Sequence, residues 1–363
     1  MIKRIYSPRT LQKILYVILG AAIAWVVFIN IGSLSAWQKV IGLILALIAI
    51  LIAIVNVWAL IEKQSTSSLV LDRLLRFMPI KDRKSEEYYK QAMLESSLPY
   101  KLPENVRSKY DVKEYEDFKD TFVIDRTDGS NELVIFYLHG GGYWVQPVSL
   151  HYMFFNKIAK ELRAEIILPM YPLAPSYTAL DVHTMVMDRY LYLINEKRKN
   201  SNNIIFMGDS AGAGLALSFV QVLRDQSLPL PRQVVLLSPW LDVTNSTAGI
   251  KEVYDPFDNV DNLTFGGKVY AGNLDPKDPL VSPIYGDISN LPPITLFSGT
   301  YDALNIDVEK FAQIAEREKI DFTLNSYAKM VHGFTGFFIT PEAKDSFKKI
   351  IEIIRSPKSL GRR

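Results

Sequence analysis

Cysteine is absent from this sequence, and histidine occurs only four times in 363 residues. Without cysteine the chain forms no disulfides, which is consistent with a reducing compartment. The sequence also lacks a cluster of metal ligands, and its glycine-rich stretch lacks the lysine or the spacing that binds phosphates or dinucleotides. A net charge of only +2 does not indicate a nucleic-acid-binding face. We therefore expect no metal, no cofactor and no nucleic-acid partner.

Charged residues are missing from two long segments near the N-terminus, Ile14–Gln38 and Val40–Ile61, which Lys39 separates. As a helix, the second segment would be about 33 Å long, enough to cross a hydrocarbon core of about 30 Å. A core helix of a soluble domain normally has a polar face, and this segment shows none. The pattern predicts a membrane anchor over residues 1–62, with transmembrane helices at about 14–34 and 40–61.

Basic residues flank the two apolar segments, whereas the loop between them carries Lys39 alone. They are Lys3, Arg4, Arg9 and Lys13 before the first segment, and Lys63, Arg73, Arg76, Lys81, Arg83 and Lys84 after the second. The positive-inside rule then places both ends, and the rest of the chain, on the cytoplasmic side of the cell membrane. The first segment could instead be a signal peptide ending near Ser33–Ala36, but its apolar stretch is longer than usual. The second segment would then still anchor the chain in the same orientation.

Two glycine-rich motifs indicate acyl-transfer chemistry. In Gly208–Gly212 (Gly-Asp-Ser-Ala-Gly), Ser210 lies between an apolar run and a helical pattern, which is typical of a nucleophile elbow that exposes a serine hydroxyl. Upstream, His139–Gly142 (His-Gly-Gly-Gly) follows the strand-like run Leu133–Leu138. Consecutive glycines let backbone N–H groups approach a developing oxyanion without an intervening Cβ.

A serine nucleophile needs a histidine as general base. The four candidates are His139, His151, His183 and His332. His139 belongs to the glycine-rich loop, and the next two histidines precede the elbow. Only His332 fits the order serine, acid, histidine that accompanies this elbow. We therefore predict that His332 is the base.

The histidine in turn needs a carboxylate that holds its tautomer. Asp302 follows the apolar run Ile294–Phe297, where a strand passes into a loop, and is the predicted acid. It could instead cap a helix. Asp307 is expected in the first turn of a helix, where the helix dipole already explains an acidic residue. Asp287 and Asp321 are less well placed.

The motifs and their order resemble the hormone-sensitive lipase family of α/β-hydrolases, which includes bacterial carboxylesterases and arylacetamide deacetylase. Further matching segments are Tyr171–Pro175, Ser238–Asp242, Ser282-Pro283, Leu291–Pro293, Asp302–Leu304 and His332–Phe334. The resemblance covers residues 110 to 355, approximately. Pro172 and Ser176 stand where the family usually has arginine and glutamate, a local departure that leaves the chemistry intact.

The resemblance implies specific roles: Ser210 as nucleophile, His332 as base, Asp302 as its orienting acid, the N–H groups of Gly141, Gly142 and Ala211 as oxyanion hole, and His139 and Gly140 in the oxyanion loop. Tyr143 and Trp144 follow this loop directly. We expect them to line the substrate pocket and to favour apolar groups. The alternative is that they only pack under the lid.

Strand-like runs alternate with helical segments, which predicts an α/β-hydrolase fold, a mostly parallel sheet flanked by helices, with a helical cap. The runs are 133–138, 165–168, 204–207, 234–237, 294–297 and 322–327. Amphipathic stretches at Leu69–Met78 and Glu86–Leu98, within a linker at 63–110, either lie on the membrane or cap the active site. The expected catalytic domain spans 111–357 with a lid insertion at about 241–285, and 358–363 form a basic tail.

The combined features predict a membrane-anchored serine hydrolase that cleaves short- to medium-chain acyl esters through an acyl-serine intermediate. Its expected partners are a small acyl-ester substrate, which can be lipophilic, and the lipid bilayer. An amide deacetylase or an acyltransferase would use the same three residues. A non-catalytic ligand-binding protein on this fold is disfavoured, because such proteins usually lose one of the three.

Overall fold

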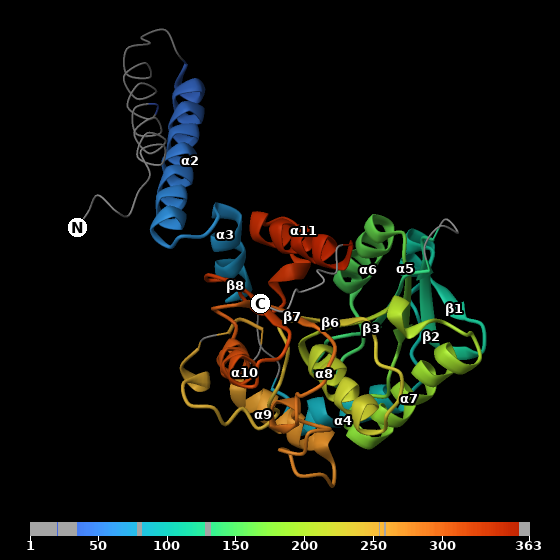
Figure 1. The fold of residues 1–363 in the computed structure, drawn as a ribbon. Coiled ribbons are helices and arrows are strands. Elements are labelled where there is room, and N and C mark those ends of the chain that lie inside the picture. The colour runs from blue at the N-terminus through green and yellow to red at the C-terminus, as the bar shows by residue number, and fades with distance from the viewer. Residues whose placement is uncertain are drawn as a thin grey trace. The chain divides into compact units, whose positions relative to one another are not determined.

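The computed structural model of the chain describes residues 20, 35–77, 82–127, 132–253, 255–257 and 259–355. The chain divides into two compact units, Met1–Arg73 and Leu74–Arg363 (Figure 1). The first contains α2 (Ala36–Ile61) and most of α3 (Thr66–Leu75). All of the described strands belong to the second.

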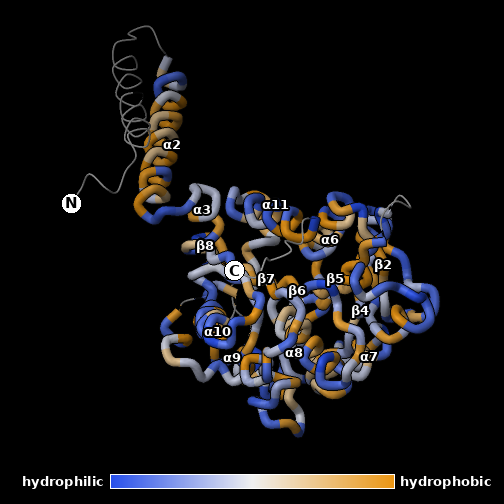
Figure 2. Tube along the Cα trace, viewed as in Figure 1, coloured by the Kyte–Doolittle hydropathy of each residue, from blue (hydrophilic) through white to orange (hydrophobic). Residues whose placement is uncertain are grey.

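Helix α2 is apolar along almost its whole length (Figure 2). It begins after Ser35, whose hydroxyl accepts the N–H of Gln38 while the Gln38 side chain accepts the N–H of Ser35. Within the described part of the chain, α2 is the one helix long and apolar enough to cross a membrane. The second predicted span, 40–61, lies within it. The first, 14–34, falls outside the described residues except for Gly20.

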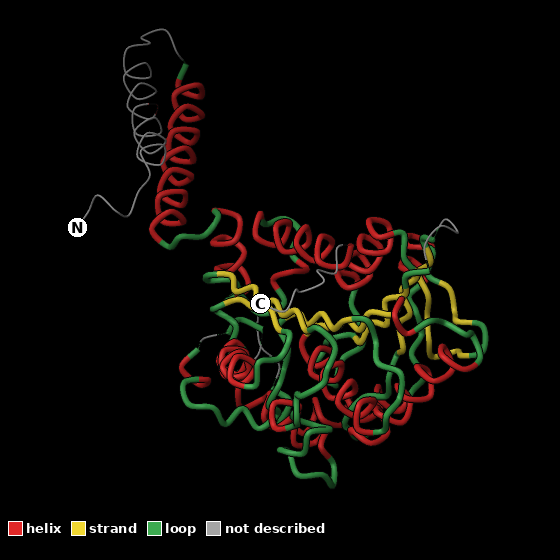
Figure 3. Tube along the Cα trace, in the orientation of Figure 1, coloured by secondary structure: helices red, strands yellow, loops and turns green. Residues whose placement is uncertain are grey.

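The second unit is built on a mixed eight-stranded sheet in the order β1-β2-β4-β3-β5-β6-β7-β8. Its strands are yellow in Figure 3, with helices and loops on both sides. Strand β2 pairs antiparallel with β1 and with β4, and all pairings from β4 across to β8 are parallel. The strands are β1 (Lys113–Tyr115), β2 (Phe118–Asp125), β3 (Val134–Leu138), β4 (Glu165–Pro169), β5 (Ile204–Asp209), β6 (Gln233–Leu237), β7 (Ile294–Gly299) and β8 (Phe322–Tyr327). The mostly parallel sheet is confirmed, whereas β1 and β2 were not predicted.

Helices cover both faces of this sheet (Figure 1). Strands β3 and β6 are buried at every position, as expected for parallel strands with helices on both sides. One apolar core forms beneath α5 (Glu104–Tyr110), α6 (Ser149–Leu162) and α11 (Pro341–Arg355). The other forms beneath α7 (Ala179–Asn195), α8 (Ser210–Asp225) and α10 (Asn305–Arg317).

Two further helices, α4 (Glu86–Ser97) and α9 (Val260–Ala271), pack together through aromatic side chains. Tyr89 of α4 contacts Phe265 of α9 edge-on, and both rings contact Trp144. The segment predicted as a lid, between β6 and β7, contains α9 and the short 3-10 helices η3 (Ile250–Glu252) and η4 (Pro283–Tyr285). A third short helix, η2 (Ser201–Asn203), precedes β5, and η5 (Phe334–Gly336) precedes α11. The predicted basic tail lies outside the described residues.

The core beside β5 provides a test of the packing. Phe206 is fully buried among Phe136, Tyr190 and Phe219, with ring centroids 5.1 to 5.6 Å away. We expect Phe206→Ala to lower the free energy of unfolding by about 3–5 kcal/mol, because it leaves a cavity in a close-packed core. Urea unfolding of the full chain in detergent micelles measures this change. Glu196 is exposed, so the free energy of unfolding of Glu196→Ala should stay within about 0.5 kcal/mol of wild type. Equal losses of stability for both variants would contradict the assignment of Phe206 to a close-packed core.

Candidate active site

Ser210 lies at the turn where β5 passes into α8. Its φ of +53° is left-handed, a conformation that is costly for a serine and persists only where the surrounding structure enforces it. The turn also requires its flanking glycines. A Cβ on Gly208 would collide with the backbone of Gly212, and a Cβ on Gly212 would collide with the carbonyl groups of Leu138 and His139. Only glycine allows this approach, so the motif produces the predicted elbow.

Two loops bring the predicted base and acid to this serine. His332 lies after β8, and its Nε2 is 2.9 Å from the Ser210 Oγ. Asp302 lies after β7, fully buried, and its Oδ2 is 2.9 Å from the Nδ1 of His332. The other Asp302 oxygen accepts the N–H of Leu304 at 2.9 Å. The three residues therefore form one hydrogen-bonded chain, because parallel strands end at the same edge of the sheet.

The charge around His332 favours its protonated form. Burial alone would lower the pKa of this imidazole, but the charge and hydrogen bond of Asp302, followed by the charges of Asp255 and Asp209, raise it to about 9. A histidine in this setting readily holds the proton that a serine gives up.

The other candidate aspartates lie elsewhere. Asp307 is in the first turn of α10 as expected, but it is fully buried and accepts the hydroxyl of Thr247. Asp287 accepts the N–H of Ser289 at 2.8 Å. Asp321 immediately precedes β8. Asp302 alone of the four is hydrogen-bonded to His332 within the described residues.

The glycine-rich loop that follows β3 lies beside the serine. Gly141 and Gly142 have φ values of +127° and +63°, which favour glycine. Their N–H groups donate to no other protein group within the described part of the chain. Ala211 is the second residue of α8, so its N–H has no acceptor inside the helix. Three backbone donors are thus available next to Ser210.

His139 anchors that loop from within. It is almost fully buried, and its ring stacks on Tyr171 with centroids 4.2 Å apart. Its Nδ1 donates to the carbonyl oxygen of Gly140 at 2.8 Å, and its own carbonyl accepts the Tyr171 hydroxyl. Burial lowers the pKa of His139 to about 4, so the ring stays neutral and acts in packing.

Asp209 and His151 make a second acid–histidine pair that sequence analysis missed. The Asp209 Oδ1 accepts the Gly140 N–H at 3.0 Å and the Tyr137 hydroxyl at 2.9 Å, and its Oδ2 lies 3.2 Å from the His151 Nε2. Burial alone would raise the pKa of Asp209, but these partners favour its charged form and lower the pKa. Because Asp209 adjoins Ser210, it fixes the glycine-rich loop to the elbow. The motif contained Asp209, but no spacing pointed to His151.

Tyr143 and Trp144 do not line the cavity next to Ser210. Tyr143 is buried and stacks face to face on Tyr270 of α9, with centroids 3.6 Å apart. Trp144 is also buried, and its indole N–H donates to the carbonyl of Gly266 at 3.2 Å. Their placement corresponds to the alternative, in which they only pack under the lid.

The cavity beside Ser210 has a volume of about 380 Å³. Ser210 and His332 lie in its wall, and most of the remaining wall is apolar, formed in part by Leu150, Phe154, Leu237, Leu263, Phe257 and Phe337. Asp255, Asp302 and His332 place ligand-type atoms within 4.8 Å of one another. The hydrogen bond between Asp302 and His332 already accounts for two of the three.

Comparison with known proteins agrees with this geometry. A family model described as alpha/beta hydrolase fold matches residues 135–336, more than half of the chain. The chain belongs to the α/β-hydrolase fold family. This α/β hydrolase is 29% identical over 235 residues to an esterase of Acinetobacter venetianus, with 64% of this chain and 77% of the relative covered.

Solved structures resemble the same part of this α/β hydrolase. The crystal structure of a putative esterase from Staphylococcus aureus matches with a TM-score of 0.69 and 29% identity, covering 78% of this chain and 96% of that one. An esterase from the bacterial hormone-sensitive lipase family matches with a TM-score of 0.65 and 25% identity, covering 79% and 95%. The hydrolase resembles esterases in sequence and in structure.

Removal of the Asp209 side chain tests how the loop is held. We expect Asp209→Ala to lower the free energy of unfolding by about 2–3 kcal/mol, since hydrogen bonds to a charged group contribute roughly 1.5–3 kcal/mol. Amide exchange at Gly140 should also accelerate, because its N–H donates to Asp209. Asp209→Asn keeps an acceptor oxygen for Gly140, so its free energy of unfolding should fall less than that of Asp209→Ala. Wild-type stability and exchange in Asp209→Ala would contradict the anchoring role.

Proposed function

We propose that this α/β hydrolase is a serine carboxylesterase that works through an acyl-serine intermediate. The observation that carries the proposal is the hydrogen-bonded chain from Ser210 through His332 to Asp302, with 2.9 Å at both steps. Such a chain lets the imidazole take the serine proton while the buried carboxylate holds the ring and stabilises its charge.

The proposed reaction has two half-reactions. In the first, the Ser210 Oγ attacks the ester carbonyl, and its proton passes to the Nε2 of His332. The N–H groups of Gly141, Gly142 and Ala211 stabilise the oxyanion. The intermediate collapses as His332 gives the proton to the departing alcohol. In the second, His332 takes a proton from water, the hydroxide attacks the acyl-serine, and the acid leaves as Ser210 recovers its proton.

The apolar cavity favours short- to medium-chain acyl groups. Its volume of about 380 Å³ is bounded largely by leucine and phenylalanine side chains. Apolar walls of this kind bind an acyl chain by burying it from water. The names of similar proteins, an esterase among them and a triacylglycerol lipase of Mycobacterium tuberculosis 33% identical over 169 residues, support ester substrates.

The anchor would hold this activity at a membrane. Helix α2 has the length and apolar surface of a transmembrane helix. The charge-free segment before it supports a second span, and the distribution of basic residues supports two cytoplasmic ends. The hydrolase would then face the cytoplasm and meet esters that partition into the bilayer.

Replacement of the proposed nucleophile tests the activity. Ser210→Ala should lower kcat/KM for p-nitrophenyl acetate and butyrate on the order of 10⁴-fold or more, because the acyl-serine cannot form. A fluorophosphonate probe should label the wild-type protein and leave Ser210→Ala unlabelled. Ser201→Ala, at the opposite end of β5, is the matched control and should retain both activity and labelling. Equal activity of Ser210→Ala and wild type would refute the proposal.

Single cysteines test the membrane orientation, since the chain has none of its own. Ser35→Cys, between the predicted transmembrane helices at about 14–34 and 40–61, should react with an impermeant maleimide added to intact cells. A cysteine at Ser65, after α2, should react only when the membrane is permeabilised, because that end is cytoplasmic. Labelling of Ser65→Cys from outside would show the opposite orientation, and labelling of neither position in intact cells would argue against the two predicted transmembrane helices.

A further inference from the structure

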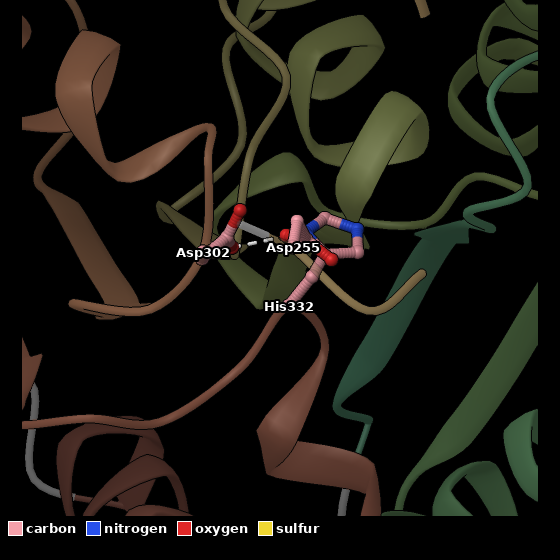
Figure 4. A group of neighbouring side chains, drawn as sticks. All are labelled: Asp255, Asp302 and His332. Carbon is pink, nitrogen blue, oxygen red and sulfur yellow. Dashed lines mark hydrogen bonds and ion pairs between the residues drawn. The ribbon is translucent and has the colours of Figure 1, made fainter. Parts of the chain in front are cut away.

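Asp255 is a buried carboxylate beside the proposed triad that has had no role so far. It belongs to the lid segment between η3 and α9 and is 8% exposed. Figure 4 shows its side chain next to those of Asp302 and His332. The carboxylate oxygens and the imidazole nitrogen lie within 4.8 Å of one another. A second carboxylate so close to a proposed catalytic pair requires an explanation, because burying a charge is costly unless it is hydrogen-bonded.

The two carboxylates share one short loop. Ala303 and Leu304 are consecutive residues directly after Asp302. The N–H of Ala303 donates to the Asp255 Oδ2 at 3.2 Å, and the N–H of Leu304 donates to the Asp302 Oδ1 at 2.9 Å. Asp255 therefore ties the lid segment to the loop that carries the proposed acid, while Asp302 makes a hydrogen bond within that loop.

The second oxygen of Asp255 orders a different part of the site. Its Oδ1 accepts the N–H of Phe257 at 2.8 Å. Phe257 lines the cavity, and its ring contacts that of His332 edge-on, with centroids 6.2 Å apart. One carboxylate thus connects the loop of Asp302 with an aromatic side chain that adjoins both the base and the substrate cavity.

Asp255 also places a carboxylate where it can stabilise positive charge on His332. When Ser210 gives up its proton, His332 becomes an imidazolium, and a nearby anion stabilises that cation. Burial, then the charge of Asp302, raise the pKa of Asp255 to about 6. Asp255 is therefore ionised at neutral and alkaline pH, where His332 titrates.

We propose that Asp255 is a positioning residue of this hydrolase, which fixes the loop of Asp302 and places a second negative charge beside His332. The inference rests on the proposed triad. Its effect passes through His332 and Asp302, and Asp255 need not touch the substrate.

Other charged or titratable groups act on the same imidazole or line its cavity, and they must be kept constant in a test. Asp302 lies on the loop after β7, and Asp209, paired with His151 of α6, lies at the end of β5. Arg83 lines the same cavity. A substitution at Asp255 leaves all four in place, so a change in pH dependence reports on Asp255 itself.

The test is the pH dependence of kcat/KM for p-nitrophenyl butyrate, with the full-length protein in detergent micelles between pH 6 and 10. The base must be neutral to act, so activity falls as the pH drops through the pKa of His332. Asp255→Asn should move this acidic limb down by about one pH unit, since removing a nearby anion lowers the histidine pKa. It should also lower the high-pH plateau about tenfold, the equivalent of one pKa unit of imidazolium stabilisation.

Two controls separate charge from structure. Asp255→Glu keeps the charge and should keep the limb near its wild-type pH, even if the longer side chain lowers the plateau. Asp261→Asn removes an exposed carboxylate of α9 in the same lid segment. It should change neither the position of the acidic limb nor the height of the plateau. Melting temperatures accompany each profile. If Asp255→Asn shows no cooperative melting, Asp255→Ser, also small and uncharged, is measured in its place.

The outcomes are distinct. If Asp255→Asn keeps the acidic limb at its wild-type pH, Asp255 supplies no effective charge to His332. The proposal, which requires both the loop contact and the charge, is then wrong, whatever happens to the melting temperature. Full activity of Ser210→Ala would overturn the proposed function and this inference together. Loss of activity in Ser210→Ala with an unshifted limb in Asp255→Asn would overturn the role of Asp255 alone.

Discussion

The left-handed backbone of Ser210 is the constraint on which the site depends. A φ of +53° at the end of β5 turns the chain sharply into α8 and directs the hydroxyl away from the sheet. The turn is possible only because Gly208 and Gly212 lack side chains where the backbone comes closest. Since β5 is a central strand, the loops after β3, β7 and β8 all end near this turn. The proposed nucleophile, its base and the oxyanion loop can therefore meet without long connections.

Hydrogen bonds from backbone N–H groups stabilise the buried carboxylates of this site. Asp209, Asp255 and Asp302 all act on His332, and each accepts at least one backbone N–H: Asp209 and Asp255 from another loop, Asp302 from Leu304 of its own loop. Such bonds offset the cost of burying a carboxylate. The same bonds fix the loops, so the charges and the loop geometry depend on each other. The proton acceptor is thereby held in a field that favours the cation it must become.

Sequence patterns found the parallel part of the sheet but missed its antiparallel edge. Buried parallel strands read as continuous apolar runs, as in β3 and β6, because helices cover both faces. Strand β2 mixes charged and apolar residues, and its partner β1 has only three residues, so neither gives a clear signal. Tyr143 followed the oxyanion loop directly, yet its ring turns under α9, since proximity in sequence does not fix the direction of a side chain.

The sequence by itself determined the local chemistry: a serine in a turn that only glycines permit, glycines where backbone donors must be exposed, and a helix without polar faces near the N-terminus. These features follow from short-range sterics and from hydropathy, which neighbouring residues express directly. Chain order and the family resemblance predicted His332 and Asp302, but only the tertiary structure brings them to Ser210, pairs His151 with Asp209 and places Asp255 beside His332. Such contacts connect residues far apart in the chain, and they depend on which strand ends the folded sheet brings together.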